Sequence, residues 1–263
     1  MVVRNEGESM AWRLAGLARP RADLATVEAG LLLLVAAGAW AGTVLVARGM
    51  AGMTGTMGLR PAAWVPVWTL MMAAMMLPSV ASAASRYVRA GSGRRLAGIA
   101  GLAAGYLAVW AAAGVPAFGL AWLAGWVTGR HPGAAHVFAV AVIAGCGMYQ
   151  LSAPKDRCLT HCRAPLAWSR PGGWARDLEA GVRHGAYCLG CCWALMVILI
   201  AVGVMNVAAM AGLAVVILVE KTWRWGTVAG RVFGVAALGL AVAVIWLPWL
   251  APGLHAAPPM MMG

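Results

Sequence analysis

Long apolar segments alternate with short polar segments along almost the whole chain. Most of the apolar segments have the roughly 17 to 25 residues that a helix needs to cross a bilayer. We expect one membrane domain over residues 29–250, preceded by a segment at 1–28 and followed by a Met-rich tail at 251–263. The pattern predicts an all-α membrane protein with about seven transmembrane helices, near residues 29–47, 63–85, 96–122, 134–151, 187–204, 207–219 and 226–250.

The composition excludes a soluble globular protein. Hydrophobic residues make up 62% of the chain and charged residues only 11%, which is far from the average of soluble domains. The net charge of +12 does not indicate a nucleic-acid partner, because the basic residues lie between the apolar segments and act as topology signals. The first residues lack a compact basic start and a small-residue cleavage site, so we expect no removable signal peptide.

The distribution of the basic residues predicts the orientation. In the seven-helix arrangement, 17 of the 20 lysine and arginine residues fall on one side and three on the other, when Arg231 near the start of the last helix is counted with the segment before it. The positive-inside rule then puts the N-terminus in the cytoplasm and the C-terminus in the periplasm of a bacterial cytoplasmic (inner) membrane. The polar segment 152–186, which contains Cys and His, is expected on the cytoplasmic side.

The fifth apolar segment contains Cys188, Cys191 and Cys192 within one helical turn. Positions three and four apart share a face of a helix, so Cys188 is expected beside the other two. His184 and Met196 extend the same stripe by one turn in each direction. Nitrogen and sulfur groups in this arrangement are a ligand set for a soft metal ion.

The polar segment repeats this spacing with Cys158, His161 and Cys162. Five of the six cysteines therefore lie between positions 158 and 192. Clustered Cys and His in a reducing compartment indicate metal binding more often than packing. For the isolated Cys146, packing is the better interpretation.

Ligand softness favours Cu(I), with zinc as the second choice. Thiolates and thioethers select Cu(I) or zinc, whereas Mg or Ca would need carboxylates that are scarce here. Thioethers are weak zinc ligands, and methionines are frequent. Core filling is the alternative for those in the second apolar segment. The candidate thioether ligands are Met71, Met72, Met75, Met76, Met196 and Met205, with Met50, Met53 and Met57 in the outer loop.

Glu220 is the one carboxylate that we expect near the metal. Carboxylates in membrane segments are costly and often functional. Glu220 either pairs with Lys221 or a loop arginine, or it orients a His or thiolate ligand. Asn206, beside Met205, is expected to cap a helix.

No motif for hydrolysis or phosphoryl transfer is present, and we expect the protein not to be an enzyme. One alternative is a membrane thiol-disulfide oxidoreductase, since Cys188 and Cys191 form a Cys-x-x-Cys pair. Another is an accessory structural subunit of a larger membrane complex, in which the metal only stabilises the fold.

Three blocks of residues resemble a bacterial family of predicted metal-binding integral membrane proteins, often labelled copper-chaperone-like. The first is the Met-rich block from Trp68 to Pro78, and the second runs from Tyr149 to Pro165. The third and most specific block runs from Cys188 to Lys221. The resemblance implies a multi-pass membrane fold and metal binding.

Taken together, the sequence predicts a membrane protein that binds Cu(I) for transport, trafficking or delivery to a cuproenzyme. The expected partners are the metal ion, the lipid bilayer and a metallochaperone or membrane-complex protein, with no nucleic acid.

Overall fold

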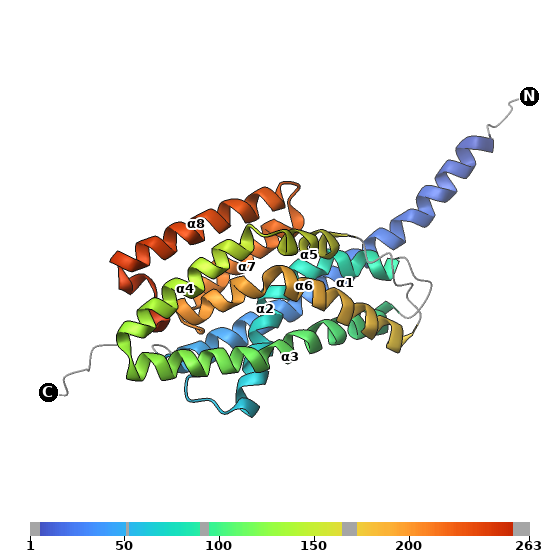
Figure 1. Cartoon of the computed structure of the whole chain (residues 1–263). Coiled ribbons are helices and arrows are strands. Elements are labelled where there is room, and N and C mark those ends of the chain that lie inside the picture. Colours follow the sequence, from blue (N-terminus) through green and yellow to red (C-terminus); the bar gives the residue numbers. More distant parts are fainter. Residues whose placement is uncertain (1–5, 51–52, 90–94, 165–172, 255–263) are drawn as a thin grey trace, which may run out of the picture.

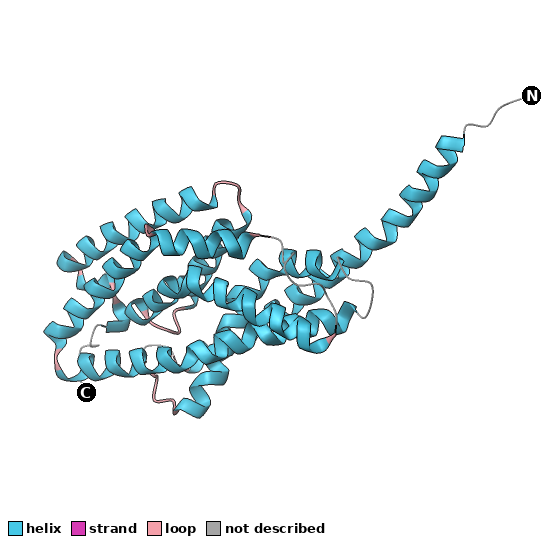
Figure 2. Ribbon diagram, turned by 45° about the vertical axis from the view of Figure 1, so that its right-hand side comes forward, coloured by secondary structure: helices cyan, strands magenta, loops and turns pink. Residues whose placement is uncertain are grey.

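The computed structural model confirms the all-α fold. It describes residues 6–50, 53–89, 95–164 and 173–254, and the described residues contain no strand (Figure 2). The helices are α1 (Glu6–Gly49), α2 (Pro61–Arg89), α3 (Arg95–Arg130), α4 (Pro132–Gln150), α5 (Ala153–Arg163), α6 (Trp174–Val202), α7 (Val207–Thr222) and α8 (Gly226–Trp246), followed by the 3-10 turns η1 (Pro248–Leu250) and η2 (Pro252–Leu254).

Six of the helices, α1 to α4, α6 and α8, are long and apolar enough to cross a membrane. The chain is therefore a multi-pass membrane protein. The remaining predicted span corresponds to α7, which has 16 residues and a length of about 24 Å at 1.5 Å per residue. Figure 1 shows α7 among the long helices and nearly parallel to them, while α1 continues well beyond the bundle at its N-terminal end.

The most extensive helix contact joins α3 to α6, and it depends on glycine. A Cβ atom at Gly181 of α6 would overlap the backbone carbonyl of Leu102, and one at Gly105 of α3 would overlap that of Leu178. Small residues let membrane helices approach closely, where van der Waals packing replaces the missing hydrophobic driving force. The helix with the predicted metal ligands is thus fixed along α3.

Helix α1 begins earlier than predicted and α3 ends later, and two further differences lie near the predicted metal ligands. Helix α6 begins at Trp174, well before the expected start at Tyr187, and the polar segment before it contains the separate helix α5. Hydropathy alone predicted neither the early start of α6 nor helix α5, because both stretches contain polar residues that the fold buries. Asp177 is buried and accepts a 2.9 Å hydrogen bond from Tyr87 of α2, and burial raises the pKa of Tyr87.

At the end of the bundle that carries residues 53–59, tight backbone contacts join the helices. Gly55, at φ +65°, lies against Gly125 of α3, and Gly253 of η2 lies against Gly203 after α6. Any side chain at Gly55 would be strained and would also collide with α3. The predicted Met-rich tail is described only through Leu254, and its residues 255–263 lie outside the described residues.

We expect replacement of Gly181 by alanine to lower the stability of the protein by about 1 to 3 kcal/mol, because the added methyl group overpacks the α3–α6 contact. The matched control is Gly239→Ala on α8, where an added Cβ would meet no atom within 4 Å. Thermal unfolding of both variants in the same detergent checks this. Equal melting temperatures for the two variants would contradict the expectation.

Candidate metal centre

The three cysteines of α6 lie together inside the bundle, as their spacing predicted. Cys188, Cys191 and Cys192 are each at most 1% exposed. The sulfur atoms of Cys191 and Cys192 are 3.3 Å apart, and the Cys191 thiol lies 3.2 Å from the carbonyl oxygen of Cys188. All six cysteines of the chain are free thiols, so the sulfurs remain available as ligands.

Polar groups from three other helices surround Cys188. The Tyr106 hydroxyl of α3 lies 2.9 Å from its sulfur, and the Lys221 ammonium of α7 donates to the same sulfur at 2.8 Å. Lys221 also donates to the Ser79 hydroxyl of α2 at 3.2 Å. An ammonium group in this position stabilises a thiolate, which is the form of cysteine that binds metals.

Helix α5 adds two further cysteines to the centre. Cys162 is buried, and its side chain interacts with those of Cys188 and Cys191. Hydrogen bonding to Cys188 raises the pKa of Cys162 to about 12. Cys158 lies one turn earlier and covers Gly190, where a Cβ atom would be only 2.7 Å from its sulfur. We call Cys158, Cys162, Cys188, Cys191 and Cys192 the thiol cluster.

Cys162, Cys188, Cys191 and Cys192 interact directly with one another, whereas Cys158 lies against Gly190 at the side of this group. Among the described residues, no group of three or more His, Cys, Asp or Glu side chains has the geometry of a metal site as it stands. Cysteine side chains reorient by rotation about a single bond. The cluster therefore offers the donor chemistry of a soft metal site, and its use requires a change of rotamers.

The two predicted histidine ligands lie in different surroundings. His184 is 4% exposed and lies against the Tyr106 ring, one turn before Cys188. His161 is on the exposed side of α5, where its Nδ1 is 2.8 Å from the Arg157 carbonyl oxygen and its ring stacks on Tyr187. The spacing that put His161 beside Cys158 and Cys162 could not show which side of α5 packs against the bundle.

Glu220 pairs with neither Lys221 nor an arginine. It forms a buried ion pair with Lys155 of α5 at 2.8 Å and accepts a hydrogen bond from Gln150 of α4 at 2.9 Å. Both charged side chains are 1% exposed. Glu220 therefore connects α7 to α4 and α5.

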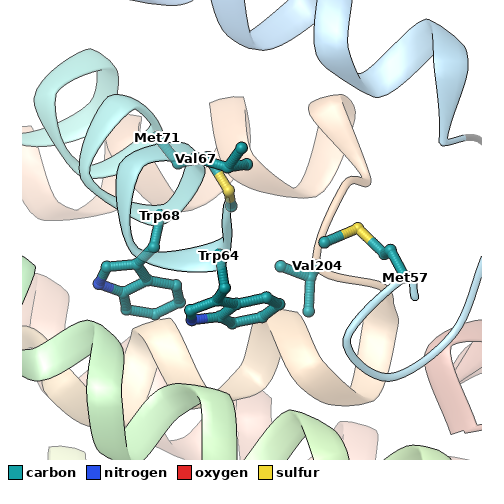
Figure 3. A pocket seen from close by; sticks show the side chains of 6 residues that line it. All are labelled: Met57, Trp64, Val67, Trp68, Met71 and Val204. Carbon is teal, nitrogen blue, oxygen red and sulfur yellow. The ribbon is translucent and has the colours of Figure 1, made fainter. Parts of the chain in front are cut away.

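The methionines of α2 precede Ser79, which Lys221 joins to Cys188 of the thiol cluster. Met71, Met72, Met75 and Met76 are all at most 2% exposed, and they precede Ser79 on faces repeated every three or four residues. Figure 3 shows Met71 beside Trp64 and Trp68 in a small pocket that Met57 closes from the outer loop. The side chains leave no room for water in this pocket.

The remaining predicted thioethers lie nearer the outer end of α6. Met196 is buried in the same core as the α2 methionines, and Met205 is in the turn that joins α6 to α7. The Asn206 side chain accepts a hydrogen bond from the Ala209 amide at 3.0 Å, which confirms the predicted helix cap.

Sequence reasoning missed three groups of the centre: Tyr106, Ser79 and the Lys221 contact to sulfur. Each lies on a different helix from Cys188, so no spacing in the sequence links them. The one available signal was Lys221 itself, because a lysine next to a carboxylate at the end of an apolar segment needs a partner in the protein.

Comparison with known proteins supports the same chemistry. Searches of curated proteins and of solved structures each gave no match. The family described as "PpoB2: Copper chaperone" matches residues 65–244, a range that includes the α2 methionines, the thiol cluster and Lys221. Since this match covers more than half of the 263 residues, the chain belongs to the PpoB2 copper chaperone family.

Proposed function

We propose that the protein binds Cu(I) inside the membrane at the thiol cluster and passes it to a cuproenzyme or a metallochaperone, without catalysing a reaction of its own. The observation that carries this proposal is the contact of Lys221 with Cys188 among five clustered thiols. The family assignment supplies copper as the metal. The monovalent state follows from the ligands, because thiolates and thioethers select Cu(I).

The charges of the site support a monovalent ion. Two thiolates, one Cu(I) ion and one ammonium group sum to zero, which matters because an uncompensated charge within a membrane is costly. Without copper, the Lys221 ammonium itself pairs with the Cys188 sulfur. Copper binding then replaces a hydrogen bond to Lys221 with a metal–sulfur bond, while Lys221 remains beside the site as counter-charge.

The methionines of α2 provide a path of weaker ligands towards the cluster. Met71 is eight positions before Ser79, a distance of about 12 Å along a helix, and Ser79 is hydrogen-bonded to Lys221. Thioethers on this face would bind Cu(I) transiently, and the thiolates would then retain it. The affinity for Cu(I) thus rises from the thioethers to the thiolates, so we expect the ion to move from the outer side inward.

The proposed location is the bacterial cytoplasmic membrane, with the N-terminus in the cytoplasm and the C-terminus in the periplasm. Helix α5 would then lie at the cytoplasmic surface. A soluble acceptor of copper could reach the cluster there through Cys158, which is less buried than Cys162.

The contact between Lys221 and Cys188 also favours a second candidate, a thiol-disulfide oxidoreductase. A neighbouring ammonium activates a cysteine for disulfide exchange. This function would require a Cys188–Cys191 disulfide that forms and breaks with glutathione buffers of changing potential. Mass spectrometry of the alkylated protein detects that disulfide directly, and a cluster that stays reduced across the range excludes this function.

Serine at positions 188, 191 and 192 should abolish tight copper binding, because a hydroxyl is a poor ligand for Cu(I). The protein is purified anaerobically in detergent, loaded with Cu(I) or Zn(II), and analysed for metal per chain. The control is Cys146→Ser, which removes a buried thiol of α4 near Lys155 and Glu220. Copper retained by the triple variant would refute the proposal.

Replacement of Lys221 by glutamine should weaken Cu(I) binding by about 10- to 100-fold, the usual effect of losing a group that supports a metal ligand. Arginine at the same position should restore much of the affinity because it keeps the positive charge. Competition with a coloured Cu(I) chelator measures both. If the Lys221→Gln and Lys221→Arg variants bind Cu(I) with the same affinity, the charge of Lys221 has no role in copper binding.

A further inference from the structure

A second group of sulfur atoms lines a cavity at the opposite end of α6 from its polar start. The cavity has a volume of about 380 Å³. Its walls come from the outer loop, from the turn between α6 and α7, and from η2. Met50, Met53 and Met205 are all among its lining residues.

The lining of this cavity favours a soft cation over other ligands. None of its lining residues is Asp, Glu, Lys, Arg or His, so it offers no carboxylate to a hard divalent cation and no cationic side chain to an anion. The Asn206 amide is already used, since it accepts from Ala209 and donates to the Val202 carbonyl at 3.3 Å. Thioethers are therefore the main ligand groups left in the walls.

The cavity also adjoins the methionine path. The turn at residues 202–207 forms one of its walls through five of its six residues. The sixth, Val204, instead lines the pocket around Met57 and Met71 (Figure 3). Met57 is 6% exposed and has a φ of 55°. This left-handed conformation is strained for a residue with a side chain and is maintained only where the surroundings enforce it.

We propose that Met50, Met53 and Met205 form an outer site that captures Cu(I) before it enters the membrane. The pocket that Met57 and Met71 both line has no space for water, so the side chains around it, Met57 among them, would have to move for the ion to reach Met71. Long, flexible side chains allow the three thioethers to close around one ion. The inference rests on the proposed function for the identity of the ion.

The site is tested in a full-length variant with serine at all five positions of the thiol cluster, so that inner binding does not mask it. Cu(I) is added alone under anaerobic conditions, and the bound metal is measured per chain. We expect residual binding that is lost when Met50, Met53 and Met205 are changed to leucine. Met148→Leu is the control, because Met148 is 61% exposed on α4 and Leu keeps the volume.

A kinetic measurement on the protein with intact cysteines covers the case in which the five-serine variant does not fold. The ultraviolet absorbance of copper–thiolate bonds reports the arrival of Cu(I) at the thiol cluster. The triple leucine variant should fill the cluster to the same final level but more slowly, and Met148→Leu should fill it at the original rate. If the triple leucine variant fills at the original rate, the outer site is overturned and the thiol cluster proposal stands. If the cluster of the unmodified protein never fills, the thiol cluster proposal is refuted.

Discussion

The ion pair between Lys155 and Glu220 holds the polar helix α5 against an otherwise apolar bundle. Both side chains are buried, and Gln150 adds a third polar group from α4. Two charges in such surroundings are tolerated only together, because removal of either leaves the other without compensation. The position of Cys162, and with it the width of the thiol cluster, depends on this pair, since α5 has few apolar residues of its own to bury.

One turn of α7 thus has two roles in the centre. Glu220 binds α5 on one side, and its neighbour Lys221 reaches Cys188 and Ser79 on the other. Successive residues of a helix point about 100° apart, so a single turn contacts both neighbours. The same turn therefore holds α5 in place through Glu220 and puts the positive charge of Lys221 beside Cys188.

Much of the fold and part of the candidate site could be predicted from the sequence, because they depend on residues close together in the chain. Hydropathy predicted the spans, and the spacing of Cys188, Cys191 and Cys192 predicted their common location. What could not be predicted depends on contacts between distant segments. Several lysines and arginines along the chain could pair with Glu220. Only the packing of the helices shows that its partner is Lys155 and not Lys221. His161 and Cys162 are neighbours in sequence, yet one faces outward and the other faces the cluster.

The glycine contact between α3 and α6 restricts how these two helices can move relative to each other. Two backbones packed this closely cannot slide or tilt without collision, so Tyr106 and the α6 cysteines behave as one rigid body. In the proposed function, the rearrangements that bring copper in and let it out would then fall on α5 and α7, which side-chain contacts hold against the α3–α6 pair. A rigid α3–α6 pair with more mobile neighbours would let the proposed Cu(I) ion change ligands while the bundle keeps its shape.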